Sequence, residues 1–331
     1  MVNSCSYNSS RKGVTDITDW NLQPLIDGIT SLDIRSCLIV QHGETILEHY
    51  RDPQIAAELG KINSCTKSVL SALVCIAIDK LIIPPPDTPI SLFFSSLKED
   101  RDPRKKEITI EHLLTMTGGF NWTEFGGQNS FPAMTKTADW IKYVLAQPLA
   151  HTPGTVMTYN SGSSQLLSAI LRDCSGQAVA EFAEDQLFQP LGIQSYHWES
   201  DPQGIHTGGF GLHLKPEDML KFGLLYLQEG RWKNQQILFS DTIQQSTRPY
   251  VEANHPQKGF YGWHWWVSQF NAGSEQQPNE IPYYFALGFK GQHIIVVPAY
   301  ELVAVITADK YKKGSPANVF GRFIVPALLG Q

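Results

Sequence analysis

Ser64 and Lys67 have the types and the spacing of a catalytic serine with a lysine base. They are the first and last residues of Ser64-Cys65-Thr66-Lys67, at the start of an apolar run that predicts a helix. Because residues three apart share a helix face, the hydroxyl and the amine can meet without help from the rest of the fold. A helix N-terminus also favours negative charge that develops on the serine oxygen. A lysine buried there loses hydration, so its pKa falls and it can accept a proton near neutral pH.

The same four residues have a simpler interpretation, a helix-capping serine followed by a solvated first-turn lysine. A chain of 331 residues contains roughly one Ser-x-x-Lys by chance. The residues after Lys67 favour the catalytic interpretation, because they are apolar nearly all round the helix. They are Val69, Leu70, Ala72, Leu73, Val74, Ile76, Ala77 and Ile78. Such a helix is expected to be buried, and a buried lysine requires a partner.

Composition and charge exclude several classes of protein. The net charge is −6 and no basic run is present, so we expect no nucleic-acid partner. The longest apolar stretch, from Val69 to Ile83, contains Asp79 and Lys80 and is too short to span a bilayer, so we expect no membrane partner. The histidines and acidic residues have no metal-binding spacing, so we expect no metal and no other cofactor.

The cysteines and the N-terminus predict a cytoplasmic protein. The five cysteines are Cys5, Cys37, Cys65, Cys75 and Cys174. Their odd number and the absence of Cys-x-x-Cys predict free thiols in a reducing compartment. Cys65 would point about 100° away from Ser64 around the helix, so we expect a small buried residue rather than a nucleophile. The segment Met1 to Tyr7 lacks the apolar region of a signal peptide.

Strand signals lie towards the two ends of the chain, and helical patterns lie between them. Hairpins are predicted from Cys37 to Tyr50 and from Gln292 to Thr307. Helices are predicted at Ile17–Ile29, Ser64–Ile82, Ile108–Leu114, Thr137–Leu145, Ser163–Cys174, Ala178–Leu187, Pro216–Leu227 and Pro316–Leu329, with Pro84-Pro85-Pro86 ending the second. The pattern predicts an α/β domain from residues 1–62 and 219–331, whose sheet comes from both termini. Residues 63–218 would form a mainly helical domain, with the active site at the interface.

Tyr159 is the candidate for the group that passes a proton to the leaving atom. It stands between a turn-rich segment and a predicted helix, where a tyrosine can point into a cleft. A nearby ammonium would lower its pKa. The alternative is a turn tyrosine with a packed ring and a solvated hydroxyl.

Gly288-Phe289-Lys290-Gly291-Gln292 contains candidates for the oxyanion site. Glycines such as Gly291 permit close approach of a substrate to a strand edge. The backbone N–H of Gln292, with that of Ser64, could form an oxyanion hole. The alternative is a turn that enters the strand.

Trp122 and His206 are two weaker candidates for the site. Trp122 follows a glycine turn and is expected either at a pocket wall or in the core. His206 lies in a glycine-rich loop and is expected either in the cleft or as a structural loop residue.

Together these motifs resemble the serine β-lactamase and penicillin-recognising superfamily. The branch nearest to them contains class C β-lactamases, D,D-peptidases, family VIII esterases and 6-aminohexanoate-dimer hydrolases. The order is Ser-x-x-Lys, then Tyr-x-Asn/Ser, then a glycine-ended triplet on a late strand. The segments His112–Gly119, Pro153–Leu167 and Tyr261–Trp266 also resemble family segments. The likeness runs from about Cys37 to Thr307.

The resemblance implies a fold and a set of roles. The fold is an antiparallel sheet flanked by helices, with an all-α insertion. Ser64 would be the acylated nucleophile, Lys67 its activating neighbour and Tyr159 the general base or acid. Ser161 stands where an Asn or Ser contacts the substrate.

The chain departs from the family pattern at two places. The triplet Lys/His-Thr/Ser-Gly, whose cation and hydroxyl hold an antibiotic carboxylate, is matched by Phe289-Lys290-Gly291. We therefore do not expect efficient β-lactam hydrolysis. Tyr-Asn-Ser also replaces the common Tyr-Ser-Asn, which leaves a shorter side chain at Ser161.

The sequence therefore predicts a serine hydrolase that forms an acyl-enzyme on a small-molecule ester, amide or lactam. One alternative is a D,D-peptidase or β-lactamase, which the lack of a signal peptide disfavours because peptidoglycan lies outside the cytoplasm. Another is a ligand-binding or sensor protein that kept the fold without turnover. The sequence does not indicate an oligomeric state.

Overall fold

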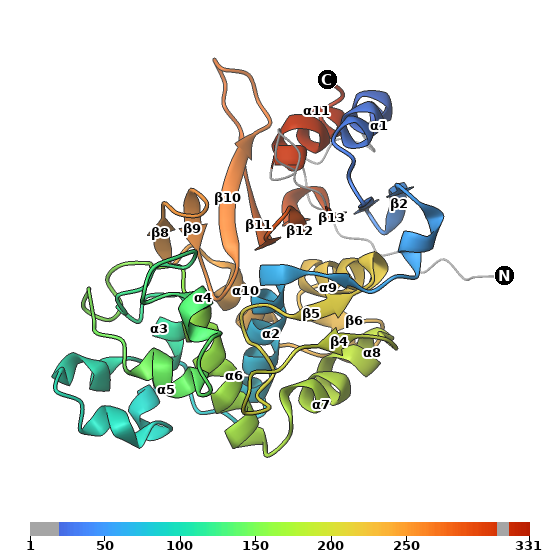
Figure 1. Cartoon of the computed structure of the whole chain (residues 1–331). Coiled ribbons are helices and arrows are strands. Elements are labelled where there is room, and N and C mark those ends of the chain that lie inside the picture. Colours follow the sequence, from blue (N-terminus) through green and yellow to red (C-terminus); the bar gives the residue numbers. More distant parts are fainter. Residues whose placement is uncertain (1–19, 310–317) are drawn as a thin grey trace.

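An eight-stranded sheet in the order β2-β1-β13-β12-β11-β10-β9-β8 forms the centre of the computed structural model, which describes residues 20–309 and 318–331. Every neighbouring pair is antiparallel. The strands are β1 Ser36–Gln41, β2 Glu44–Tyr50, β8 Val251–Ala253, β9 Gly259–Tyr261, β10 Trp266–Asn271, β11 Glu280–Gly288, β12 Gln292–Val297 and β13 Leu302–Thr307. Because β1 pairs with β13, the sheet joins segments from both ends of the chain, as the sequence predicts (Figure 1).

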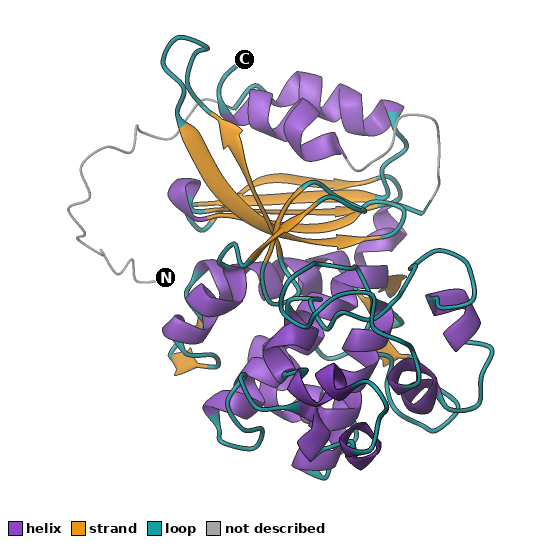
Figure 2. Ribbon diagram, turned by 90° about the vertical axis from the view of Figure 1, so that its left-hand side faces the viewer, coloured by secondary structure: helices purple, strands orange, loops and turns teal. Residues whose placement is uncertain are grey.

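Helices cover both faces of the sheet (Figure 2). Helices α1 (Leu22–Ser31) and α11 (Val325–Leu328) pack on one face, and α2 (Thr66–Asp79) and α9 (Pro216–Leu227) on the other. Successive strand residues point to opposite faces, so in β13 Ala304 faces α1 while Val303 and Val305 face α9. All of β1, β12 and β13 is consequently buried, and most of their residues are apolar.

A larger helical layer lies beyond α2. It contains α3 Ile110–Leu114, α4 Phe131–Met134, α5 Trp140–Leu145, α6 Ser161–Ser175, α7 Val179–Ala183, α8 Gln189–Leu191 and α10 Ser240–Thr247. Two small sheets accompany it: β3 Gly60–Lys61, β5 Leu212–Leu214 and β4 His197–Trp198 form one, and β6 Arg231–Trp232 and β7 Gln235–Gln236 the other. Every residue of α2 from Thr66 to Ala77 is buried, which confirms the prediction of a helix surrounded by protein.

The ends of α2 differ from the prediction. The helix begins at Thr66, and Ser64 lies in a preceding 3₁₀ turn, Asn63–Cys65. It ends at Asp79, several residues before the prolines. Leu81 has a φ of +59°, and the N–H groups of Ile82 and Ile83 both donate to the Ala77 carbonyl. This left-handed turn, rather than the proline run, therefore ends the helix.

Other predicted elements are largely confirmed. The first hairpin turns at His42 and Gly43, whose φ values of +52° and +79° are those of a tight I′ turn. Helix α9 has the predicted bounds, and Pro24 lies in the first turn of α1. The predicted last helix is divided into a π-helical turn, Phe320–Ile324, and α11. Its first two residues lie outside the described part of the chain.

The free-thiol prediction agrees with the structure for the cysteines that it describes. Cys37, Cys65 and Cys75 are buried free thiols, and Cys174 is partly exposed. Cys5 and the segment Met1 to Tyr7 lie outside the described residues. Within the described ranges, no helix is long and apolar enough to cross a membrane. The division into an α/β domain (residues 1–62 and 219–331) and a helical domain (residues 63–218) remains a prediction.

Candidate active site

Lys67 is the centre of a buried hydrogen-bonded cluster that includes Ser64. The lysine is 1% exposed. Its Nζ lies 2.8 Å from the Gly209 carbonyl oxygen, 2.9 Å from Ser161 Oγ and 3.3 Å from Ser64 Oγ. It also lies 4.7 Å from the centre of the Tyr159 ring. The structure thus brings together the four residues that the sequence singles out as Ser-x-x-Lys and Tyr-x-Ser.

The turn that carries Ser64 is fixed by its neighbours. Asn63 adopts a φ of +50°, and its Nδ2 donates to the Phe289 carbonyl at 2.8 Å. The Thr66 hydroxyl donates to the Asn63 carbonyl at 2.6 Å, and the Leu212 N–H donates to that same hydroxyl at 3.3 Å. These bonds tie the turn to β5 and to the end of β11. Ser64 itself is half-buried, so its hydroxyl can reach both Lys67 and a ligand.

Tyr159 lies against the same serine. Its hydroxyl interacts with the Ser64 side chain. Its ring stacks on Trp266, with centroids 5.8 Å apart and an interplanar angle of 24°. The next residue, Asn160, caps α6 by accepting from the N–H groups of Gly162 and Ser163. The stacked ring and the capped helix hold the phenol beside Ser64.

Glu124 also belongs to the cluster, although no sequence motif marks it. The residue is 9% exposed. Its Oε2 accepts from Trp122 Nε1 at 2.8 Å and from the Ser161 N–H at 3.0 Å, while its Oε1 accepts from the Ser161 hydroxyl. Trp122 is itself buried, and this bond holds Glu124 in the cluster. One glutamate in a loop has no spacing pattern, and the only signal in the sequence was its place two residues after Trp122.

Burial shifts the pKa of Lys67 and the pKa of Tyr159 in opposite directions. It lowers the pKa of Lys67 to about 8, against the opposing charge of Glu124. Burial also raises the pKa of Tyr159 far above its ordinary value, and the Glu124 charge raises it further, while the hydrogen bond with Ser64 opposes both. The expectation that an ammonium lowers the Tyr159 pKa is therefore wrong, because desolvation of the phenolate dominates. Lys67 can accept a proton near neutral pH, whereas Tyr159 remains a phenol.

The end of β11 packs closely against the Ser64 turn, which also touches the start of β12 through Cys65. The Gly288 backbone packs so tightly that a Cβ there would lie 2.3 Å from the Ile62 carbonyl oxygen. Lys290 and Gly291, with φ values of +67° and +92°, reverse the chain, and the Gly291 N–H donates to the Gly288 carbonyl. The expectation that Phe289-Lys290-Gly291 lies on a strand is wrong, because these residues form the turn between β11 and β12.

Gln292 is the first residue of β12, opposite Gly288. Its side chain bonds to the backbone of Ala308, and the Cys65 thiol donates to its carbonyl at 3.5 Å. Its role as an oxyanion donor stays a prediction. Gln292 and the exposed Phe289 and Lys290 line a cavity of about 260 Å³ beside Asn63.

A larger cavity, of about 710 Å³, adjoins Tyr159. Its lining comes from three segments of the chain: residues 122–126, residues 155–159, and Val251, Glu252, Asn254 and His255. Phe125 is 61% exposed there and meets His255 edge to face at 6.2 Å. A cavity of this size next to the cluster can hold a small substrate.

His206 does not bring its glycine-rich loop to the cluster. It packs against Trp198, with ring centroids 6.1 Å apart, and its carbonyl accepts from the Ser168 hydroxyl at 2.6 Å. These contacts fit the structural alternative. The loop instead reaches Lys67 through the carbonyl of Gly209, because the absence of a side chain there lets the backbone approach.

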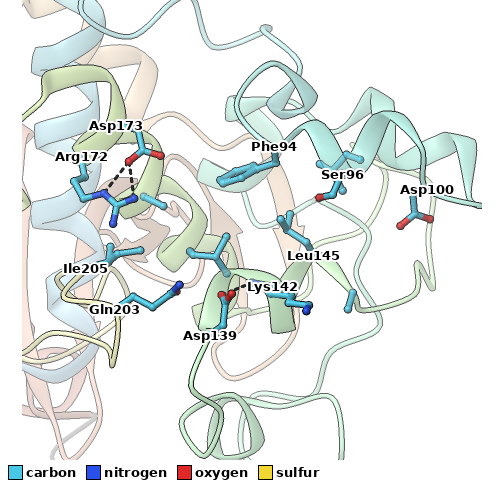
Figure 3. A pocket seen from close by; sticks show the side chains of 14 residues that line it. Phe94, Ser96, Asp100, Asp139, Lys142, Leu145, Arg172, Asp173, Gln203 and Ile205 are labelled. Carbon is cyan, nitrogen blue, oxygen red and sulfur yellow. Dashed lines mark hydrogen bonds and ion pairs between the residues drawn. The ribbon is translucent and has the colours of Figure 1, made fainter.

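A further cavity, of about 430 Å³, lies in the helical layer (Figure 3). It is lined by α5, α6 and residues 94–100, and its charged groups include the Arg172–Asp173 ion pair. None of the clustered residues around Lys67 lines it. Across the described ranges, no group of three His, Cys, Asp or Glu residues could hold a metal ion.

The Beta-lactamase family model matches residues 36–325. The chain belongs to the β-lactamase family. This confirms the resemblance seen in the sequence and the predicted fold, and it indicates a hydrolase.

Individual proteins show the likeness in more detail. A D-alanyl-D-alanine-carboxypeptidase/endopeptidase, AmpH, of Escherichia coli K12 is 24% identical over 228 residues, which are 62% of this chain and 56% of that protein. A putative 6-aminohexanoate-dimer hydrolase from Bacillus anthracis superposes with a TM-score of 0.76 at 18% identity, over 95% of this chain and 85% of the other. A class C β-lactamase from Rhodobacter sphaeroides superposes with a TM-score of 0.68 at 14% identity, over 93% of this chain and 98% of the other.

Proposed function

We propose that this β-lactamase-family protein is a serine hydrolase that cleaves an ester or amide through an acyl-enzyme on Ser64. The observation that supports the proposal most directly is the buried Lys67 amine, 3.3 Å from the Ser64 hydroxyl oxygen and with a pKa lowered to about 8. At that pKa about a tenth of the amine is neutral at pH 7 and can act as a base.

In the proposed reaction Lys67 acts first and Tyr159 second. Lys67 takes the Ser64 proton as Oγ attacks the carbonyl carbon, which gives a tetrahedral oxyanion. The N–H of Ser64 and one from the Gly288–Gln292 segment are the proposed oxyanion donors. The bond from the carbon to the leaving atom then breaks, and Tyr159, whose hydroxyl interacts with Ser64, gives that atom its proton and becomes a phenolate. In the second half, a water molecule gives a proton to the Tyr159 phenolate and attacks the acyl carbon. The bond from that carbon to Ser64 Oγ then breaks as Lys67 returns its proton to the oxygen, which releases the acid and restores the three residues.

The proposed substrate is small and is an ester, an amide or, less efficiently, a lactam. The cavity beside Tyr159 has room for such a molecule. Lys290 lies in an exposed turn and not on β11, so the strand beside Ser64 carries no cation for an antibiotic carboxylate. Amides stay in the proposed class because similar proteins include a 6-aminohexanoate-dimer hydrolase and a D-alanyl-D-alanine-carboxypeptidase/endopeptidase.

Steady-state turnover of three probes tests the proposal: p-nitrophenyl esters of increasing acyl length, a p-nitroanilide and nitrocefin. We expect ester or anilide hydrolysis that Ser64→Ala abolishes, with nitrocefin cleaved slowly or not at all. Ser274→Ala, in an exposed loop, is the matched control and should leave the rate unchanged. Hydrolysis that survives in Ser64→Ala contradicts the proposal. Binding or stable acylation without turnover of any probe supports the alternative of a sensor protein.

A further inference from the structure

The hydrogen bonds between Glu124 and Ser161 can run in only one direction. The ionised carboxylate has no proton to give, so the Ser161 hydroxyl must donate to Oε1. Two N–H donors, from Trp122 and from the Ser161 backbone, occupy Oε2, which leaves Oε1 for the Ser161 hydroxyl. A serine hydroxyl carries a single proton. Ser161 therefore presents only lone pairs to Lys67.

The remaining contacts then fix the orientation of the Lys67 amine. The Gly209 carbonyl can only accept a hydrogen bond, and with its proton given to Glu124, Ser161 can also only accept. In the ammonium form the third N–H points to Ser64. In the neutral form both N–H groups go to Gly209 and Ser161, and the lone pair is left facing Ser64 Oγ at 3.3 Å.

We propose that Glu124 is a positioning residue, which acts through Ser161 to direct the lone pair of neutral Lys67 at Ser64. This inference rests on the proposed serine hydrolase activity. Without Glu124 the Ser161 hydroxyl is free to turn and donate to the lysine lone pair. Ser161 Oγ is 2.9 Å from Nζ, closer than Ser64 Oγ at 3.3 Å, so that unproductive bond would form in preference.

Glu124→Gln is the sharpest test because it keeps the shape and reverses the bonds. The two N–H donors require the amide oxygen at the Oε2 position. The amide nitrogen must then donate to Ser161 Oγ, and the serine proton turns towards Lys67. Glu275→Gln, in an exposed loop, is the control for a lost carboxylate. Thermal unfolding of each variant establishes that it is folded.

The measurement is the rate of Ser64 acylation by a p-nitrophenyl ester, followed from the initial burst between pH 5 and pH 10. We expect Glu124→Gln to lower the rate about 100-fold or more at every pH, with KM nearly unchanged, since general-base catalysis is typically worth a factor of about 10² to 10⁴. If Glu124 acts only through its charge, the loss of that charge lowers the Lys67 pKa and the rate above pH 9 stays at the wild-type value. That second result overturns the proposal.

Two further variants keep the test decisive even where Glu124→Gln fails to fold. Ser161→Ala removes the hydroxyl and should lose acylation, while Ser161→Thr keeps it and should retain most of the rate. Equal rates in the Ala variant and the wild type overturn the proposal. A wild-type protein that gives no burst and no fluorophosphonate adduct instead contradicts the hydrolase function itself, so the two failures are distinguishable.

Discussion

The Ser64 hydroxyl oxygen lies 3.3 Å from the Lys67 amine, inside a cluster that leaves the lysine 1% exposed. The distance and the burial act together. The contact gives the proton a short path, and desolvation makes the amine a base near neutral pH.

The rate of acylation should depend on pH through Lys67. Burial lowers the lysine pKa to about 8, and only the neutral amine can take the Ser64 proton. We therefore expect the burst rate to level off above pH 8 and to fall about tenfold for each pH unit below it. Stopped-flow measurements with a p-nitrophenyl ester check this. A rate that is constant from pH 6 to pH 10 would mean that Lys67 is not the base.

Tyr159→Phe should separate the chemistry from the packing. The ring keeps its stacking on Trp266 and its contact with Lys67, so the midpoint of thermal unfolding should change by only a few degrees. The hydroxyl that interacts with Ser64 is lost, and we expect kcat to fall by about 10² to 10³. An unchanged kcat for an amide, whose leaving nitrogen needs a proton, would exclude Tyr159 as the donor.

His264 should make the fold less stable in acid. Its N–H groups donate to the Leu114 carbonyl, its Nε2 accepts from the Ser164 hydroxyl, and its carbonyl accepts from the Ser68 hydroxyl. Burial, and the Lys67 charge to a lesser extent, lower its pKa to about 3. Below pH 6.5 the unfolded chain binds a proton that the folded chain excludes. The folded state therefore becomes less stable as the pH decreases. Protonation of this one residue in the unfolded chain should lower the free energy of unfolding by about 2 kcal/mol between pH 7 and pH 5.

Urea unfolding of the wild type and of His264→Gln at the two pH values isolates that contribution. The variant should be less stable at pH 7, because buried partners lose their bonds. Between pH 7 and pH 5 the variant should lose less free energy of unfolding than the wild type, by about 2 kcal/mol. Equal pH dependence in the two proteins would show that His264 does not carry the effect.

Gly288→Ala should impair the site through the backbone alone. The new Cβ would lie 2.3 Å from the Ile62 carbonyl oxygen, so the strand or the adjacent Ser64 turn must move. We expect a stability loss of about 1 to 3 kcal/mol and a larger fall in acylation rate than that loss explains. Gly321→Ala, which meets only the Asn318 side chain, is the control. Wild-type acylation in Gly288→Ala would show that this close contact does not position Ser64.

The sequence was most informative where periodicity and order carry the signal. The hairpin strands, α9 and the buried α2 follow from apolar patterns that the structure keeps. Ser64, Lys67 and Tyr159 were recognisable because residue type and order both recur in the family. Ser64 and Lys67 could be expected to meet because they are only three residues apart. The approach of Tyr159 to them could be expected only from the family resemblance.

The remaining features depend on contacts that no local pattern records. Glu124 is tied to the site by its bonds to Ser161, which is 37 residues away along the chain. The direction of the Tyr159 pKa shift is set by burial in the folded chain. The turn at Phe289–Gly291 was predicted as part of a strand because Lys290 adopts a left-handed φ that its residue type does not suggest.

Mass spectrometry of the quenched burst tests the central claim most directly. The protein is mixed with a p-nitrophenyl ester, acidified within the burst and digested, and the acylated peptide is sequenced. The proposed mechanism predicts one acyl group, on Ser64, that disappears in Ser64→Ala and decays at the rate of turnover in the wild type. Turnover with no acylated peptide, or with the acyl group on another residue, would contradict it.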